Sequence, residues 1–197
     1  MPKDRREIRR TLLDVAGGQS GLFTAAQALS AGYSYQAQKY HVDHGNWARI
    51  DRALFRLPEW PVGPHEDLMR WVLWSRGKGV ISHETALSVN GLGDVDPTRV
   101  HLSVPPNFRM SAPGVELHRG ALSQSDVAHH DGLSITTAAR TVLDVAAGDL
   151  DADQFRQAVS EAIRRGMVTR KELLARADAF GTHAALRIER ALVEPLT

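Results

Sequence analysis

The sequence has no cysteine among its 197 residues. This absence excludes a disulfide framework, a cysteine-rich zinc site, a thiol nucleophile and an iron–sulfur cluster. Any metal site would have to be built from histidine and carboxylate side chains alone. Lysine is also scarce, since most of the 24 basic residues are arginine.

Long hydrophobic runs are missing as well. The longest apolar stretches have only a few residues, far fewer than the roughly 20 needed to cross a bilayer, and the start MPKDRREIRR has no apolar stretch of the signal-peptide type. We therefore expect a cytoplasmic protein with no membrane partner. With 43% hydrophobic and 24% charged residues, the chain has the composition of a globular protein, large enough for two small domains.

Charge is nearly balanced over the whole chain but not along it. The first 60 residues carry nine Lys and Arg against six Asp and Glu, a net charge of +3, whereas the remainder has a net charge of −2. A basic N-terminal module followed by a slightly acidic one is compatible with local contact to nucleic acid.

Three short helices are expected in the N-terminal region. The segment 4–16 has apolar residues at helical spacing and ends at two glycines. Thr24 is a suitable N-cap for a second helix ending at Gly32, and Ser34 for a third ending at Gly45. The tight connection between the second and third helices indicates a helix-turn-helix.

A β-hairpin is expected next. Residues 47–50 and 54–57 are short runs with the side-chain alternation of a strand, they are joined by a polar turn, and the second run stops at Pro58. A helix-turn-helix followed by a hairpin is a winged helix. An α-helix fits the major groove, and hairpin arginines can reach phosphates or the minor groove, although the unit could also be only a small scaffold. The side chains expected to contact DNA are Ser34, Tyr35, Gln36, Gln38 and Lys39 on the third helix and Arg49, Arg52 and Arg56 on the hairpin.

The prolines and glycine at residues 58–64 predict a linker, which divides the chain into domains 1–60 and 61–197. The second domain should combine helices at 65–77 and 83–90 with strands at 99–104, 115–118 and 132–135, followed by four C-terminal helices. The predicted fold class is α+β, an N-terminal winged helix-turn-helix followed by a small mixed sheet-and-helix domain.

Nine histidines raise the question of a metal or catalytic centre. Adjacent His129, His130 and Asp131 do not converge on one ion as easily as ligands spaced along a helix. Ser82, His83 and Glu84 have the residue types of a catalytic triad, but neighbouring residues at the start of a helix point in different directions and cannot meet as nucleophile and base. Ser82 is expected to cap a helix. We therefore expect no metal site, no cofactor and no catalytic residue. Arg140 and Asp144 have the spacing of a helix-stabilising ion pair, and their place just after a strand would also suit an interface or a buried structural pair.

A nuclease is the alternative from another functional class. Asp94, Asp96 and Glu116 could supply carboxylates for metal-assisted phosphodiester cleavage, but the strand residue two beyond Glu116 is His118 and not lysine. No phosphate-binding glycine motif is present in the sequence, so nucleotide binding has no support.

Several sequence blocks resemble the AbiEi-type antitoxins of type IV toxin–antitoxin systems, which are linked to abortive phage infection. In the N-terminal domain these blocks are GLFTAAQA from Gly21 and GNWARIDRALFRLP from Gly45. In the second domain they are ISHETA from Ile81 and LSITTAARTVLD from Leu133.

The resemblance implies a non-enzymatic DNA-binding antitoxin and transcriptional repressor of its own bicistronic operon. Its partners would be double-stranded promoter DNA and a nucleotidyltransferase-like toxin, which the second domain would help to neutralise. The alternative is a nucleic-acid-processing enzyme or degenerate nuclease with a winged-helix targeting domain.

Overall fold

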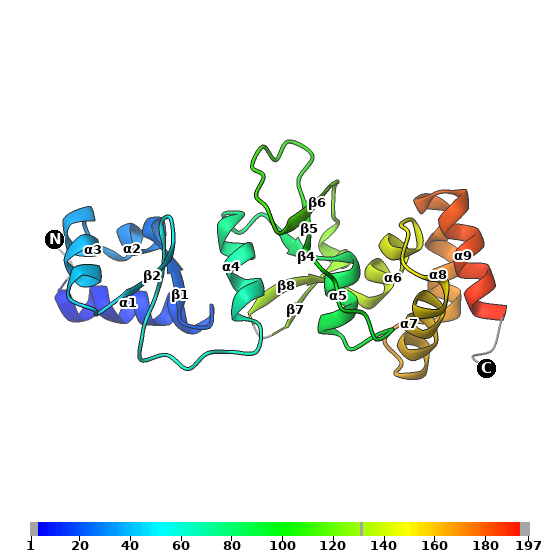
Figure 1. The fold of residues 1–197 in the computed structure, drawn as a ribbon, viewed down its shortest axis with the longest axis horizontal. Helices are drawn as coiled ribbons and strands as arrows, with labels where there is room; N and C mark the ends of the chain where they lie inside the picture. Colours follow the sequence, from blue (N-terminus) through cyan, green and yellow to red (C-terminus); the bar gives the residue numbers. More distant parts are fainter. Residues whose placement is uncertain (1–3, 131, 194–197) are drawn as a thin grey trace. The chain divides into compact units, whose positions relative to one another are not determined.

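A computed structural model describes residues 4–130 and 132–193 of the chain, which is α+β (Figure 1). The chain forms two compact units, one from residues 1–77 with 130–133 and the other from residues 78–129 with 134–197. None of the helices in the described residues has the length and apolar character needed to cross a membrane.

Within its described residues, the first unit contains four helices and a three-stranded antiparallel sheet in the order β1-β3-β2. Its elements are α1 (Arg5–Gly17), β1 (Leu22–Thr24), α2 (Ala25–Ala31), α3 (Tyr35–Asp43), β2 (Ala48–Asp51), β3 (Leu54–Arg56) and α4 (Glu66–Trp74). The three N-terminal helices and the hairpin are therefore confirmed. Strand β1 was not predicted, because three residues are too few for a period to be visible.

Capping residues and one aromatic cluster explain this local structure. Thr24 accepts a hydrogen bond from the Gln27 backbone N–H at 3.2 Å, and the Gln27 side chain accepts one from the Thr24 N–H at 2.8 Å, which completes a capping box. In the core, Phe23 lies edge-on to Trp47, with ring centroids 4.8 Å apart, and also contacts Phe55. This cluster joins β1 to β3 and to the residue that precedes β2.

The boundary between the units differs from the predicted linker at 58–64. Residues 57–64 are indeed outside helices and strands, but α4 then packs against β1 and β3 and belongs to the first unit. The division falls between Gly77 and Lys78. Prolines stop a helix or strand, but they do not reveal whether the chain afterwards returns to the same core.

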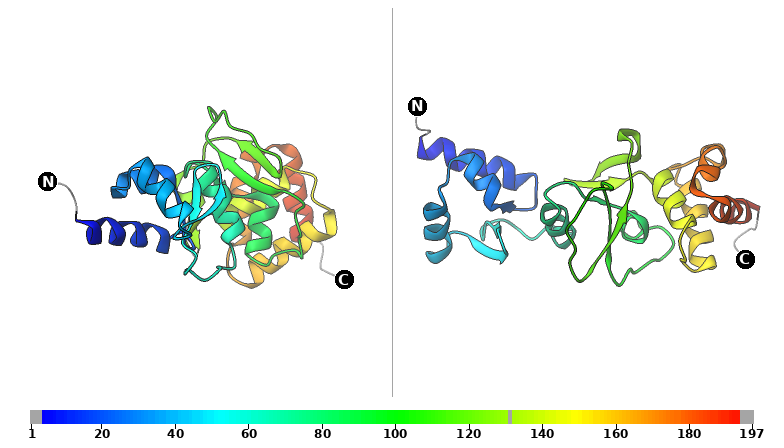
Figure 2. Two further views of the ribbon diagram at one scale, coloured as in Figure 1. Left: turned by 60° about the vertical axis from the view of Figure 1, so that its left-hand side comes forward. Right: turned by 90° about the horizontal axis from the view of Figure 1, so that it is seen from above.

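The second unit has a five-stranded sheet in the order β6-β5-β4-β8-β7 and a group of helices beside it (Figures 1 and 2). Its elements are β4 (Val80–Ile81), α5 (His83–Val89), β5 (Val100–Val104), β6 (Val115–Arg119), the 3-10 turn η1 (Gln124–Asp126), β7 (Val127–His130), β8 (Leu133–Thr136), α6 (Ala138–Ala146), α7 (Ala152–Arg164), α8 (Arg170–Ala177), η2 (Asp178–Phe180) and α9 (Thr182–Val193).

The sheet is mixed in direction. Strand β4 is antiparallel to β5 and parallel to β8, whereas β5 and β6 run parallel, so the loop between them returns to the start of β5. The strands expected at 99–104 and 115–118 are confirmed as β5 and β6. Helix α6 lies within the helical group, where it contacts α5, α7, α8 and α9, and it contributes a continuous apolar face to the main core.

The turn of the β2–β3 hairpin contains a strained position. Ala53 has φ of 59°, in the left-handed region that favours glycine, and its carbonyl accepts a hydrogen bond from the Ala25 N–H at 2.9 Å. The hairpin turn therefore fixes the start of α2 as well as the register of the two strands.

We expect Ala53→Gly to raise the free energy of unfolding by about 1 kcal/mol, because glycine adopts this conformation without a Cβ clash. Urea denaturation of the full chain measures the change. The matched control is Ala121→Gly, at an exposed loop position without positive φ, which should lower stability slightly. A loss of stability in the Ala53 variant would contradict the strain at this turn.

Candidate functional site

Helix α3 and the hairpin of the first unit present most of the predicted DNA-contacting side chains to solvent. Tyr35 is 71% exposed, and Gln36 and Lys39 are also exposed. Ser34 is used as the N-cap of α3, where its Oγ accepts a hydrogen bond from the Ala37 N–H at 3.2 Å. Lys39 makes an exposed ion pair with Asp43. Because an exposed pair contributes little stability, Lys39 can leave Asp43 and bind another anion at a small cost in free energy.

The prediction that Gln38 faces outward is wrong. Its side chain is only 3% exposed, and its Nε2 donates to the carbonyl oxygens of Ala25 at 3.1 Å and Tyr33 at 3.3 Å. These bonds attach α3 to the start of α2 and to the connection between the two helices. The exposed position four residues after Gln36 is occupied by Tyr40.

The prediction for Arg56 is also wrong. Its Nε donates to Glu66 Oε2 at 3.1 Å and its Nη2 to the Trp60 carbonyl oxygen at 2.6 Å, and the side chain is mostly buried. Arg56 therefore ties β3 to α4 and is not free to contact phosphate. Arg49 and Arg52 remain exposed on the hairpin, and the Arg49 guanidinium lies over the Phe55 ring at 5.4 Å.

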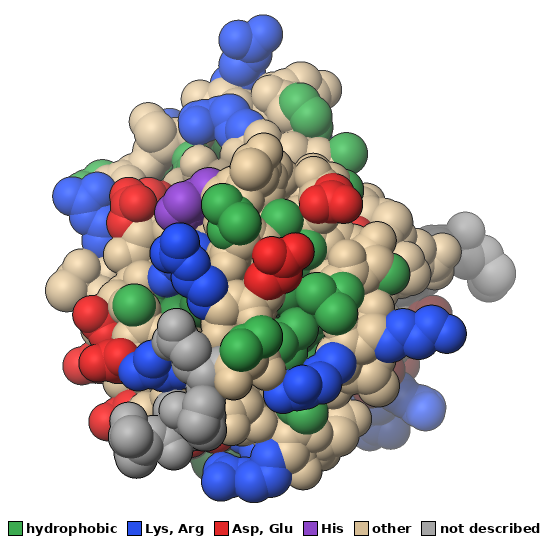
Figure 3. Space-filling view, turned by 90° about the vertical axis from the view of Figure 1, so that its right-hand side faces the viewer, with side chains coloured by type: hydrophobic (Ala, Val, Ile, Leu, Met, Phe, Trp, Pro, Cys, Tyr) green, Lys and Arg blue, Asp and Glu red, His purple; other side chains and the backbone are tan. Residues whose placement is uncertain are grey.

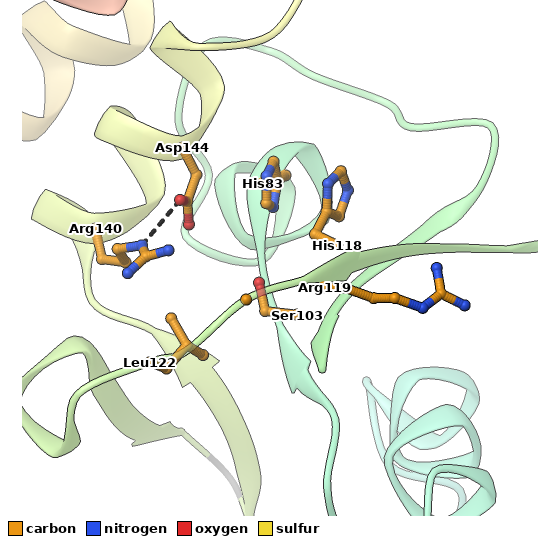
Figure 4. Close-up of a pocket in the computed structure, with 8 residues that line it drawn as sticks. His83, Ser103, His118, Arg119, Leu122, Arg140 and Asp144 are labelled. Atoms are coloured by element: carbon orange, nitrogen blue, oxygen red, sulfur yellow. Dashed lines mark hydrogen bonds and ion pairs between the residues drawn. The ribbon is translucent and has the colours of Figure 1, made fainter. Parts of the chain in front are cut away.

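A second candidate site, which the sequence did not predict, is a pocket of about 170 Å³ in the second unit (Figure 4). It is lined by residues of α5, β5, β6, the loop after β6, and α6: His83, Ser103, His118, Arg119, Gly120, Leu122, Arg140 and Asp144. In Figure 4, His83 lies between Asp144 and His118, and the Arg119 side chain is directed away from them.

The two histidines that line this pocket, His83 and His118, are stacked on each other and uncharged at neutral pH. The rings of His83 and His118 are nearly parallel, 3.4 Å between centroids, and His118 Nε2 lies 3.0 Å from His101 Nδ1. Burial lowers the pKa of His83 to about 2 and that of His118 to about 4, and the neighbouring imidazoles add to both shifts. Neither ring is therefore a strong proton acceptor near pH 7.

On the α6 side of the pocket, arginine and aspartate side chains form a network of ion pairs. Asp126 accepts hydrogen bonds from Arg176 Nη2 at 2.5 Å and Arg140 Nη1 at 3.3 Å, while Arg140 Nε donates to Asp144 Oδ1 at 2.8 Å. Of the interpretations open for the Arg140–Asp144 spacing, the structure supports the buried pair, since Asp144 is 6% exposed. Burial raises the pKa of Asp144 to about 6, although Arg140 acts in the opposite direction.

The other residues considered for catalysis do not form a site. Ser82 occupies the N-cap position of α5, but its side chain makes no cap hydrogen bond, and its Oγ lies 3.0 Å from His83 Nδ1. Asp94, Asp96 and Glu116 are exposed. In residues 4–130 and 132–193, no group of three or more His, Asp or Glu side chains could hold a metal ion; Asp131 lies outside the described residues.

Comparison with known proteins adds information on the fold alone. No family model and no curated protein matches the chain. Among solved structures, the chain is similar over its full length to the crystal structure of the RV2827C protein from Mycobacterium tuberculosis, of which it covers 84%, with a TM-score of 0.53 and 13% sequence identity. At this identity the similarity supports the α+β architecture.

We expect the pocket histidines to make the second unit sensitive to acid. The pKa of His83 is lowered in the folded state, so its contribution to stability is present above its unfolded pKa near 6.5 and is lost as the pH falls toward 2. When the pH falls from 6.5 to 4.5, the free energy of unfolding should therefore decrease less in His83→Gln than in the unaltered chain. The two decreases should differ by roughly 2 kcal/mol.

Chemical denaturation at the two pH values measures this difference. His129→Gln is the matched control, because it removes an exposed imidazole that does not line the pocket. The same loss of stability in His83→Gln and in the unaltered chain would show that His83 does not carry this pH dependence.

Proposed function

We propose that the first unit is a winged helix-turn-helix that binds double-stranded DNA, and that the chain is the antitoxin and autorepressor of a toxin–antitoxin operon. The observation that carries the DNA-binding part is the position of α3. Gln38 anchors this helix from its buried side, while Tyr35, Gln36 and Lys39 on its early turns stay exposed.

The arrangement of elements supports this proposal. The order α1-β1-α2-α3-β2-β3, with a three-stranded antiparallel sheet, is compatible with a winged helix. Helices α2 and α3 contact each other across Gly32, whose φ of 127° permits the tight turn. Helix α3 is then the recognition helix, and the exposed Arg49 and Arg52 on the hairpin reach the DNA backbone or minor groove.

The antitoxin part rests on the sequence blocks that resemble AbiEi-type proteins. Two of these blocks contain the pocket residues His83, Arg140 and Asp144, so the resemblance and the polar pocket fall on the same segments. We propose that the second unit counters a nucleotidyltransferase-like toxin encoded by the neighbouring gene and that the protein itself is not an enzyme.

Replacing Gln36 by alanine tests the recognition helix. The variant should lose preference for the promoter of its own gene, by roughly 1–3 kcal/mol for a base contact, and should keep weak affinity for scrambled DNA. Fluorescence anisotropy with both DNA fragments measures the two affinities. Gln124→Ala, at an exposed position of the second unit, is the control. Unchanged discrimination in Gln36→Ala would contradict the assignment of α3.

Replacing both Arg49 and Arg52 by alanine should separate the two proposed roles. Each arginine that contacts phosphate contributes about one unit to the salt dependence of DNA binding, so the variant should bind all sequences more weakly and with a lower salt slope. It should still protect cells that express the neighbouring toxin, because both residues lie in the first unit.

The readouts are binding titrations at several salt concentrations and growth during co-expression with the toxin. Arg109→Ala, an exposed arginine of the second unit, is the matched control for DNA binding. An unaltered salt slope would contradict the role of the hairpin. Failure of the unaltered chain to protect cells would contradict the antitoxin proposal. It would not contradict the proposal that the first unit binds DNA.

A further inference from the structure

The first unit contains a pocket of about 510 Å³ that includes none of the side chains proposed to contact DNA. This α1 pocket is lined by residues of α1, of α3 and the loops on both sides of α3, and of the segment after β3. Its volume falls within the range of roughly 300–1,000 Å³ of pockets that bind small molecules. Hydrophobic side chains also lie among charged ones on the face of the molecule in Figure 3, but a small ligand loses most of its contact with water in a pocket and little of it on an open surface.

Most of the lining of the α1 pocket is apolar or aromatic. Leu12, Trp47 and Leu57 are buried, at 2–4% exposure, whereas Leu13 and Tyr33 are half-buried and keep part of their surface accessible. The Tyr33 ring lies edge-on to Trp47, with ring centroids 4.9 Å apart, so the tyrosine is held in place by the aromatic cluster. The pocket therefore offers a fixed apolar surface for a hydrophobic group of a ligand.

The charged side chains of the lining are one cation and one anion. Arg9 Nη2 lies 4.0 Å from Glu59 Oε1, and the two side chains are 71% and 56% exposed. The other titratable groups of the lining are uncharged near pH 7, because burial raises the pKa of Tyr33 and lowers that of His41. The lining thus has no net charge, but it presents both signs next to each other.

A ligand with both charges is complementary to this pair. An exposed ion pair contributes little stability, so Arg9 and Glu59 can exchange each other for ligand groups at a small cost in free energy. A ligand with one charge would pair with one of these side chains and leave the other without its partner. The carboxylate and ammonium groups of an α-amino acid are attached to the same carbon, so they are adjacent, as are Arg9 and Glu59. The planar Arg9 guanidinium is also suited to bind a carboxylate through two hydrogen bonds.

We propose that the α1 pocket binds a free α-amino acid with a large apolar side chain, such as phenylalanine. Arg9 binds the α-carboxylate and Glu59 the α-ammonium group, and the apolar side chain of the ligand packs against Leu13 and Tyr33. This ligand site goes beyond the proposed function, and its test requires neither DNA nor a toxin.

Calorimetric titration of the full chain with phenylalanine tests the proposal. Phenethylamine lacks the carboxylate and phenylpropionate lacks the ammonium group, while free alanine keeps both charges but has no large side chain. Each of these three compounds should bind more weakly than phenylalanine, by roughly tenfold or more. The proposal would be overturned if phenylalanine did not bind at millimolar concentration, or if any of the three bound as tightly as phenylalanine.

Two variants test the assigned contacts. Arg9→Gln should weaken the binding of phenylalanine by roughly tenfold but leave that of phenethylamine nearly unchanged, because phenethylamine has no carboxylate. Glu59→Gln should likewise weaken the binding of phenylalanine but not that of phenylpropionate. Both side chains are exposed, so the variants should fold as the unaltered chain does, which thermal denaturation checks.

The matched controls are Arg10→Gln and Glu7→Gln, at exposed positions of α1 that do not line the pocket. Both should bind phenylalanine like the unaltered chain. An equal loss of affinity in Arg9→Gln and Arg10→Gln would show a general effect of charge and would overturn the role of Arg9. Unchanged affinity in Arg9→Gln or in Glu59→Gln would overturn the proposed recognition of both charges.

Discussion

The second unit depends on the carboxylate of Asp126, which is buried between two arginines that come from different helices. Arg140 of α6 and Arg176 of α8 both donate to this carboxylate, and the Asp126 carbonyl accepts the Thr137 N–H just before α6 begins. The same Arg140 holds Asp144 one turn further along α6. Because removal of one partner from a buried ion pair costs about 3–5 kcal/mol, these contacts fix the helices and the pocket wall together.

Local structure followed from local sequence signals. Thr24 and Ser34 cap the helices they were expected to cap, and the alternating residues of the hairpin form β2 and β3. The burial of Gln38 and Arg56 could not be predicted in this way. Gln38 is the buried residue of α3, but a polar side chain does not mark an inward face in a hydrophobic pattern. Arg56 meets Glu66 only after the chain has passed the prolines.

The pocket was missed because its members come from segments that are distant in sequence. His83, Ser103, His118 and Arg140 each stand in an ordinary helix or strand pattern, and only the pairing of parallel β5 and β6, which places Ser103 opposite His118, brings two of them together. The spacing of Arg140 and Asp144 was a local signal of a buried pair, but it did not indicate that one carboxylate oxygen would be left without a hydrogen-bond partner among the described residues.

The anchoring of α3 has a consequence for the thermodynamics of any partner that docks on it. Two hydrogen bonds from Gln38 attach the helix to α2 and to Tyr33, so rotation or sliding of α3 would break both of them in a buried environment. The exposed row of the helix is therefore pre-organised. Association on this face would include little conformational entropy loss in the backbone, and its heat-capacity change should reflect desolvated surface with no contribution from coupled folding.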